Sequence, residues 1–155
     1  MLIRLLRQLR SSVLGRRNAP LQSAWQIVGW WEARRIPFNL IVGATGIVTS
    51  VGILVTALIS EHFLGEPIGM PDPPVIAVVG AVLFVLGANA CYTGGWIGEL
   101  LVRRAWPDQS EQFGTLMFTL GLGFAVVVTL LPAVLIGGMA FLFGLARAMG
   151  YSGFE

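Results

Sequence analysis

Three long apolar stretches constrain this chain more than any other feature of its sequence. They cover residues 38–59, 75–98 and 115–146, and each exceeds the roughly 18 residues that indicate a transmembrane helix. The chain has 155 residues, of which 55% are hydrophobic. Too little sequence remains outside these stretches to build a separate soluble core. We therefore predict an all-α integral membrane protein, a helical bundle with three transmembrane helices.

The arginines predict how these helices are oriented. Seven of the ten precede the first stretch, and arginines near a span mark the cytoplasmic side of a membrane. The connection 60–74 has three acids and no Arg, whereas the connection 99–114 carries Arg103 and Arg104. All three segments agree on an inner membrane protein with a cytoplasmic N-terminus. The basic cluster accordingly predicts contact with anionic lipid headgroups and no nucleic-acid partner.

The last apolar stretch leaves two topologies open. Its 32 residues from Thr115 to Ala146 would span about 48 Å as one helix at ~1.5 Å per residue, more than the ~30 Å hydrocarbon core. Pro132 lies near its middle and would kink such a helix. A hairpin at Pro132 would instead give four spans, but it would leave backbone groups unsatisfied at the membrane edge. We prefer one long, bent third helix.

Residues 1–37 form a predicted cytoplasmic arm, ahead of a transmembrane domain from 38 to 155. Apolar residues recur at helical spacing over 2–14, with arginines on another face, as in a helix lying in the headgroup region. A second amphipathic piece, from Leu21 to Ile36, carries three tryptophans. Indole rings favour the membrane interface. We therefore expect this arm to lie on the membrane surface.

A first motif, from Trp30 to Asn39, directly precedes the first span. Glu32 can pair with Arg35 three residues later, or Arg34 can contact a lipid phosphate, and Asn39 can cap the helix or bridge to a neighbouring one. The motif predicts either an aromatic and basic membrane anchor or a specific docking surface for a partner. Its candidate residues are Trp30, Trp31, Glu32, Arg34, Arg35 and Asn39.

A second motif lies in the second half of the second span. Steps of three and four residues place five polar or aromatic side chains on one helix face: Asn89, Tyr92, Trp96, Glu99 and Arg103. Polar groups within a membrane are costly without partners, and Glu99 has one in Arg103 at i+4. This polar stripe predicts either hydrogen bonding between helices or a track that lines a small cavity or docks a partner.

Small residues mark faces where helices can pack closely. Gly80, Gly87 and Gly94 repeat every seven residues in the second span, and Gly98 follows Gly94 by four. Similar pairs occur in the first span (Gly46 with Ser50, Gly52 with Thr56) and in the third (Gly114 with Gly121). Small residues let helix backbones approach to van der Waals contact. Because three spans make a thin bundle, some of these faces are candidates for oligomerisation or for a partner subunit.

The two motifs together resemble those of a set of small bacterial multi-pass membrane proteins. Those carry W-E-x-R-R-x-x-[FY]-N before the first span and N-x-C-Y-x-x-G-W-x-x-E-L later. The matching residues here are Trp31, Glu32, Arg34, Arg35, Phe38 and Asn39, then Asn89, Cys91, Tyr92, Gly95, Trp96, Glu99 and Leu100. The resemblance implies a membrane location and brings no particular activity with it.

No pattern in the sequence indicates catalysis, a cofactor or a metal site. A single cysteine, Cys91, and a single histidine, His62, cannot form an intrachain disulfide or a site built mainly from those residues. We expect Cys91 to be a small apolar packing residue. The leading hypothesis is a non-enzymatic membrane protein that associates through its helices, as an oligomer or an accessory subunit. The alternative is a small transporter or channel that uses the polar stripe.

Overall fold

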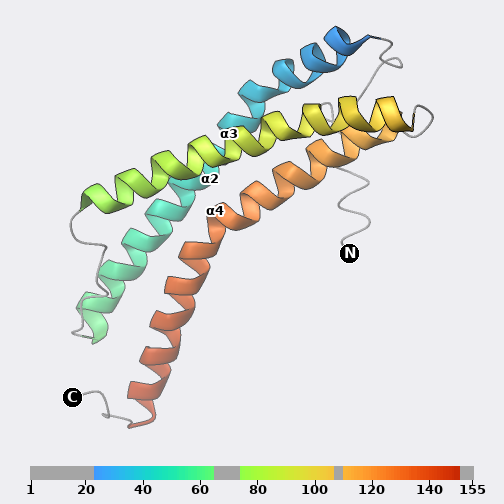
Figure 1. Cartoon of the computed structure of the whole chain (residues 1–155). Helices are drawn as coiled ribbons and strands as arrows, with labels where there is room; N and C mark the ends of the chain where they lie inside the picture. The colour runs from blue at the N-terminus through green and yellow to red at the C-terminus, as the bar shows by residue number, and fades with distance from the viewer. Residues whose placement is uncertain (1–22, 65–73, 107–109, 151–155) are drawn as a thin grey trace.

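The computed structural model describes residues 23–64, 74–106 and 110–150 of the chain. They form three α-helices: α2 (Ala24–Leu64), α3 (Pro74–Ala105) and α4 (Ser110–Ala148) (Figure 1). No strand occurs in these ranges. All three helices are long and apolar enough to cross a membrane. The predicted all-α bundle with three transmembrane helices is therefore confirmed.

Helix α2 is a single helix of 41 residues that begins well before the first predicted span. A capping box starts it: the Ser23 hydroxyl accepts the Gln26 N–H at 3.3 Å, and the Gln26 side chain accepts the Ser23 N–H at 3.2 Å. The helix continues through Pro37, so the predicted boundary between arm and membrane domain falls inside it. Residues 1–22 lie outside the described residues, and the surface position of the arm stays a prediction.

Helix α4 passes through Pro132 without a hairpin. It bends near its middle (Figure 1), as expected where a proline removes one backbone hydrogen bond. The Thr49 hydroxyl on α2 donates to the Thr129 carbonyl of α4 at 2.8 Å, close to this interruption. The structure thus has one long, bent third helix, and the four-span alternative is not formed.

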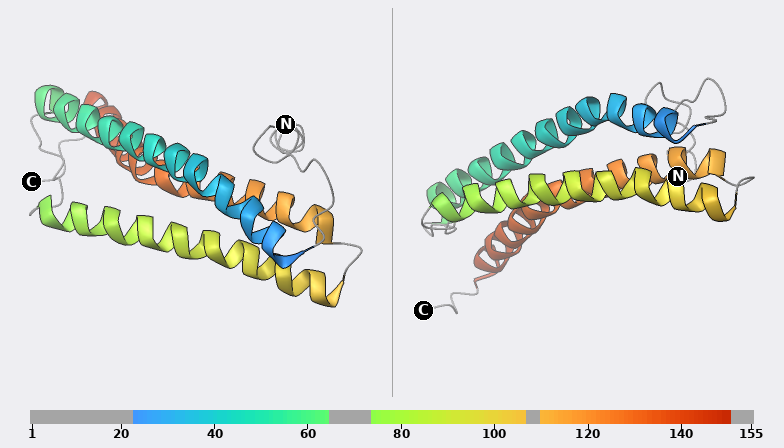
Figure 2. Two further views of the ribbon diagram at one scale, coloured as in Figure 1. Left: turned by 90° about the horizontal axis from the view of Figure 1, so that it is seen from above. Right: turned by 45° about the horizontal axis from the view of Figure 1, so that its top comes forward.

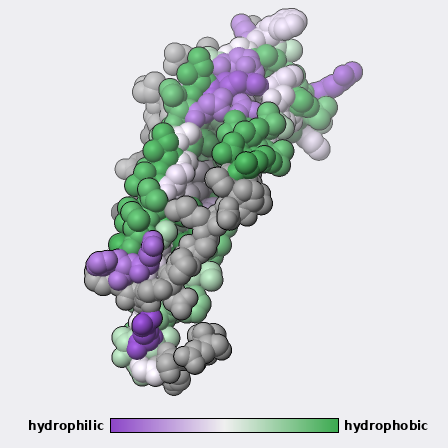
Figure 3. All heavy atoms as spheres, turned by 90° about the vertical axis from the view of Figure 1, so that its left-hand side faces the viewer, coloured by the Kyte–Doolittle hydropathy of each residue, from purple (hydrophilic) through white to green (hydrophobic). Residues whose placement is uncertain are grey.

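Helices α2 and α4 pack against each other along much of their length, and α3 joins them mainly at one end (Figure 2). The start of α2, the end of α3 and the start of α4 meet there, whereas α3 and α4 diverge toward the other end (Figure 1). Hydrophobic side chains cover much of the surface (Figure 3). Many large apolar residues are exposed, including Ile47, Leu83 and Phe141. An apolar exterior suits a protein whose solvent is lipid.

The small residues of α2 form the contact with α4. A Cβ added at Gly52 would lie 3.6 Å from the Ala133 Cβ, and one added at Gly46 would lie 3.9 Å from a methyl of Thr129. The backbones of α2 and α4 are therefore close along this line. The expectation that the first span packs through its small residues is confirmed for Gly46 and Gly52, whereas Ser50 is exposed.

Candidate functional site

A cluster of buried side chains holds the three helices together at the end where they meet. Its members come from every helix: Ile27, Trp30, Trp31, Phe38, Val42, Tyr92, Phe118, Leu122 and Ala125. Trp31 lies at its centre, with edge-to-face ring contacts to Tyr92 at 5.3 Å and Phe118 at 5.9 Å between centroids. Such aromatic pairs contribute about 0.5–1.5 kcal/mol each beyond their buried area. This aromatic cluster joins all three helices at one end of the bundle.

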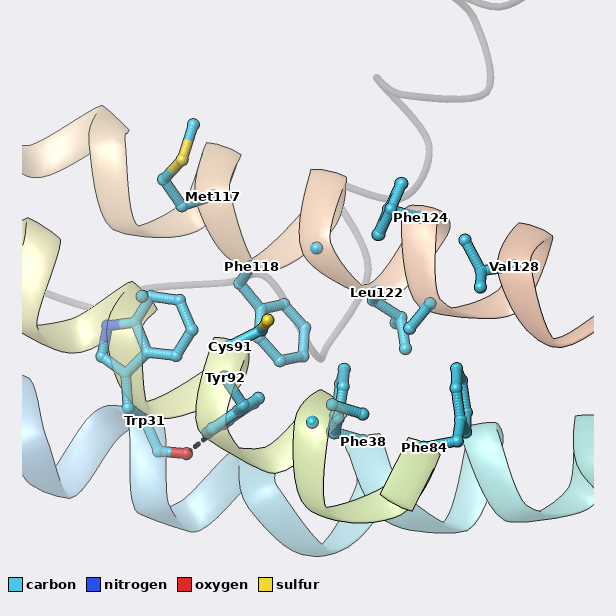
Figure 4. Close-up of a pocket in the computed structure, with 15 residues that line it drawn as sticks. Trp31, Phe38, Phe84, Cys91, Tyr92, Met117, Phe118, Leu122, Phe124 and Val128 are labelled. Atoms are coloured by element: carbon cyan, nitrogen blue, oxygen red, sulfur yellow. Dashed lines mark hydrogen bonds between the residues drawn. The ribbon is translucent and has the colours of Figure 1, made fainter. Parts of the chain in front are cut away.

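Two buried hydrogen bonds tie Trp31 on α2 to α3. Its indole N–H donates to the Glu99 carboxyl oxygen Oε2 at 2.8 Å, and its backbone carbonyl accepts the Tyr92 hydroxyl (Figure 4). Glu99 is only 1% exposed and Trp31 only 2%. Burying a carboxyl group without a hydrogen-bond donor costs free energy of desolvation. The indole N–H of Trp31 offsets part of that cost. This explains how an acidic residue is tolerated in the interior.

The Trp31 ring also lies directly against the backbone of α3. A Cβ added at Gly95 would lie 2.7 Å from the ring carbon Cη2, closer than real side chains approach. Gly95 is therefore a position where only a missing side chain lets the indole reach Glu99. The spacing of small residues predicts helix packing at Gly94 and Gly98, and it does not single out Gly95 between them.

A row of polar side chains runs along the junction of α2 and α3, which we call the α2–α3 polar seam. Arg35 Nη2 donates to Glu32 at 2.8 Å and to the Thr93 hydroxyl at 3.1 Å. Asn39 and Asn89 donate to each other's side-chain oxygens at 3.2 and 3.0 Å. The predicted Glu32–Arg35 pair is thus confirmed, as is the expectation that Asn39 bridges to a neighbouring helix.

The structure corrects the membrane-anchor role expected of Trp30 and Trp31. Both indoles are buried within the bundle, whereas Trp25 is 84% exposed and Trp106 is 62% exposed. Because the whole motif reads as aromatic and basic, its composition could not separate interior rings from surface rings. Arg34 meanwhile lies over the Trp30 ring, 4.0 Å from its centroid, and donates to the Trp30 carbonyl at 3.0 Å.

The polar stripe of α3 turns mainly toward α2. Asn89, Tyr92 and Glu99 all make hydrogen bonds to α2 residues, which fits hydrogen bonding between helices. The partner that Glu99 finds in Trp31 lies on another helix, where spacing within α3 could not reveal it. The expected pairing of Glu99 with Arg103 stays a prediction. The Trp96 indole nitrogen is shielded and has no hydrogen-bond partner among the described residues.

Away from the seam, α3 and α4 enclose an apolar cleft of about 290 Å³. Trp31, Phe38, Tyr92 and Phe118 reach it from the aromatic cluster, and Phe84 and Phe124 lie toward its far end (Figure 4). Its walls carry small residues: Gly87 and Cys91 on α3, and Gly121 and Ala125 on α4. The cleft is a hollow between two helices that diverge.

The predicted glycine row of α3 makes little contact within the chain. A Cβ added at Gly80, Gly87 or Gly94 would meet nothing within 4 Å, and only Gly98 lies near a neighbour, Phe113, at 3.8 Å. The row therefore stays a prediction for contacts with other molecules. Cys91, expected to pack inside the protein, is instead exposed on a wall of the cleft. Cys91 therefore lies on the face of α3 that borders the α3–α4 cleft.

Comparisons with protein-family models, with curated proteins and with solved structures found no match to this chain. The resemblance carried by the two motifs stays a prediction. Among the described residues, no group of three or more His, Cys, Asp or Glu side chains lies close enough to hold a metal ion.

Proposed function

We propose that this protein acts by associating with other membrane helices through the α3–α4 cleft, as a homo-oligomer or as an accessory subunit of a larger complex. In this proposal it resides in the bacterial inner membrane with its N-terminus in the cytoplasm. The role is one of assembly and needs no chemistry at the site. One observation carries the proposal. The glycines of α3 at positions 80, 87 and 94 have no close neighbour in the described residues, and Gly87 lines the apolar cleft.

The contrast between the two glycine-containing surfaces supports this proposal. On α2, Gly46 and Gly52 pack against α4 inside the chain, whereas Gly80 and Gly87 on α3 have no neighbour within 4 Å. Glycine in a helix costs roughly 1 kcal/mol relative to alanine, so an exposed row needs a compensating gain. Close approach of a second helix supplies it through van der Waals contact. The cleft beside Gly87 offers room for side chains from that helix.

The polar stripe gives less support to the transporter alternative. Asn89 and Glu99 hydrogen-bond to α2, and Tyr92 is the only member of the stripe on the wall of the cleft. A pathway for ions or polar solutes needs polar groups along its walls, and this cleft is apolar. Association therefore agrees better with the contacts that α3 makes.

The single cysteine allows a direct test in native membranes. Because Cys91 lies on the cleft wall, oxidative crosslinking should give a covalent dimer if two copies meet there. A tagged protein purified in mild detergent should in parallel carry either a second copy or a stoichiometric foreign subunit, identified by mass spectrometry. A monomeric mass at every concentration, with no foreign subunit and no crosslink, would contradict the proposal.

A pair of glycine variants gives the matched comparison. Gly87→Leu places a large side chain in the cleft and should abolish crosslinking or retention of the partner. Gly43→Leu adds the same side chain on α2, where a Cβ also meets nothing within 4 Å, and should leave association unchanged. Equal association of both variants with the parent would show that the α3 glycine row is not the interface.

A further inference from the structure

We propose that the α2–α3 polar seam binds one phosphate oxyanion, with Arg35 as its principal ligand and the phosphate of an inner-leaflet lipid as its source. This site is separate from the apolar cleft, so it stands or falls independently of the proposed function. The seam carries hydrogen-bond donors that the described residues leave without an acceptor.

Arg35 uses only part of its guanidinium group. Both described hydrogen bonds leave from Nη2, to Glu32 and to Thr93. Nε has no partner, and none is found for Nη1 among the described residues. An arginine carries five N–H donors in a rigid fork that matches the oxygens of a phosphate. Three of the five therefore have no acceptor among the described residues: the shielded Nε–H and the two N–H groups of Nη1.

Other donors on the seam are unused as well. Each carboxamide nitrogen has two N–H groups; Asn39 spends one on Asn89, while Asn89 spends both, on Asn39 and on the Val85 carbonyl. The Trp96 indole N–H has no partner, and Trp96 follows Thr93 by three residues on the same helix. Buried donors without acceptors are rare and call for an explanation. An oxyanion bound at Arg35 would supply an acceptor for the donors of this side chain that have none.

Charge and accessibility agree with a lipid headgroup as the source. The Arg35 side chain keeps 33% of its exposure, and Asn39 is exposed beside it. Arg35 lies three residues before the first predicted span, at the arginine-rich end of the sequence, where inner-leaflet headgroups are expected. Thr93 and Glu32 hold the guanidinium in place, which lowers the entropy lost when an anion binds.

Native mass spectrometry of the full chain in neutral detergent can test this site. The probes are dioleoylphosphatidylglycerol, dioleoylglycerol, which has the same tails without the phosphate, and inorganic phosphate. We expect one phosphatidylglycerol retained per chain and no comparable retention of dioleoylglycerol. Arg35→Gln should weaken this retention roughly tenfold, the size expected for losing a charge-assisted hydrogen bond, and Arg35→Lys should restore part of it. Arg104→Gln removes equal charge from α3 and should change nothing.

A gain-of-binding variant guards against misfolding of the arginine variants. Glu32→Gln frees Nη2 from its carboxylate and should strengthen phosphatidylglycerol retention. Stabilisation by inorganic phosphate beyond that by chloride at equal ionic strength would support the same site with a free anion as its source. Equal retention of phosphatidylglycerol and dioleoylglycerol, or retention indifferent to both Arg35→Gln and Glu32→Gln, would overturn the proposal.

Discussion

The indole nitrogen of Trp31 lies 2.8 Å from Oε2 of Glu99, although 68 residues separate the two along the chain. This bond links the first part of α2 to the end of α3, inside an aromatic cluster that also includes Phe118 of α4. Both side chains are buried, so the bond crosses the interior between the two helices. The Trp31 ring therefore makes contacts to both other helices at this end of the bundle.

Trp31→Phe should destabilise the bundle. The variant keeps an aromatic ring but leaves the Glu99 carboxyl without this donor, at a cost of about 1–3 kcal/mol. Unfolding by SDS in mixed micelles, followed by circular dichroism, measures the change. Trp25→Phe is the matched control because Trp25 is 84% exposed. Equal stability of the two variants would show that the Trp31–Glu99 bond contributes nothing.

Gly95→Ala should also destabilise the fold, whereas Gly94→Ala should not. The new methyl at 95 would lie 2.7 Å from the Trp31 ring, while a Cβ at 94 meets nothing within 4 Å. Overpacking of this kind costs about 1–3 kcal/mol, and alanine in a free helix position gains up to about 1 kcal/mol. The same unfolding assay on the two variants gives the comparison. A reversed order of stability would contradict the packing of Trp31 on α3.

The Asn39–Asn89 pair should show a favourable coupling energy. Each side chain donates to the other, and interhelical hydrogen bonds in membranes contribute about 0.6 kcal/mol on average. A double-mutant cycle with Asn39→Leu and Asn89→Leu measures this energy apart from the effect of each change. Strictly additive single and double variants would mean that the two amides are independent.

The proposed topology, with each of the three helices crossing the membrane once, puts the start of α2 and the end of α4 on opposite sides. Phosphatase and green fluorescent protein fusions at the C-terminus should therefore report a periplasmic end, because the predicted N-terminus is cytoplasmic. A fusion in the connection 99–114 should report the cytoplasm and serve as the internal reference. A fluorescent, phosphatase-inactive C-terminal fusion would contradict the three-span topology.

The helices were predictable because the apolar composition of each one indicates that lipid surrounds it. A run of apolar residues long enough to cross lipid is a local property, and so is the Glu32–Arg35 pair one helical turn apart. The helix ends were less predictable. Helix α2 begins at Ala24, fourteen residues before the predicted span. The sequence did not reveal this, because an interior aromatic cluster and a surface anchor have similar compositions.

The contacts between helices could be predicted only in part. Asn39 and Asn89 were both marked as polar groups in need of partners, but no pattern within one helix shows that they meet. The Trp31–Glu99 bond and the close approach at Gly95 depend on the relative rotation of α2 and α3. That rotation is set by the packing of all three helices together, and the periodicity within one helix gives no information about this packing.

The bend and packing of α4 have a consequence for how the chain assembles during synthesis. Helix α2 packs mainly on α4, which follows α3 in the chain, so its main contact surface has no partner from these helices until α4 has been made. Trp31 and Glu99 belong to the first two helices and can meet earlier. The Trp31–Glu99 contact would then join α2 to α3 before α4 is made, and the same Trp31 ring would gain its contact with Phe118 of α4 afterwards.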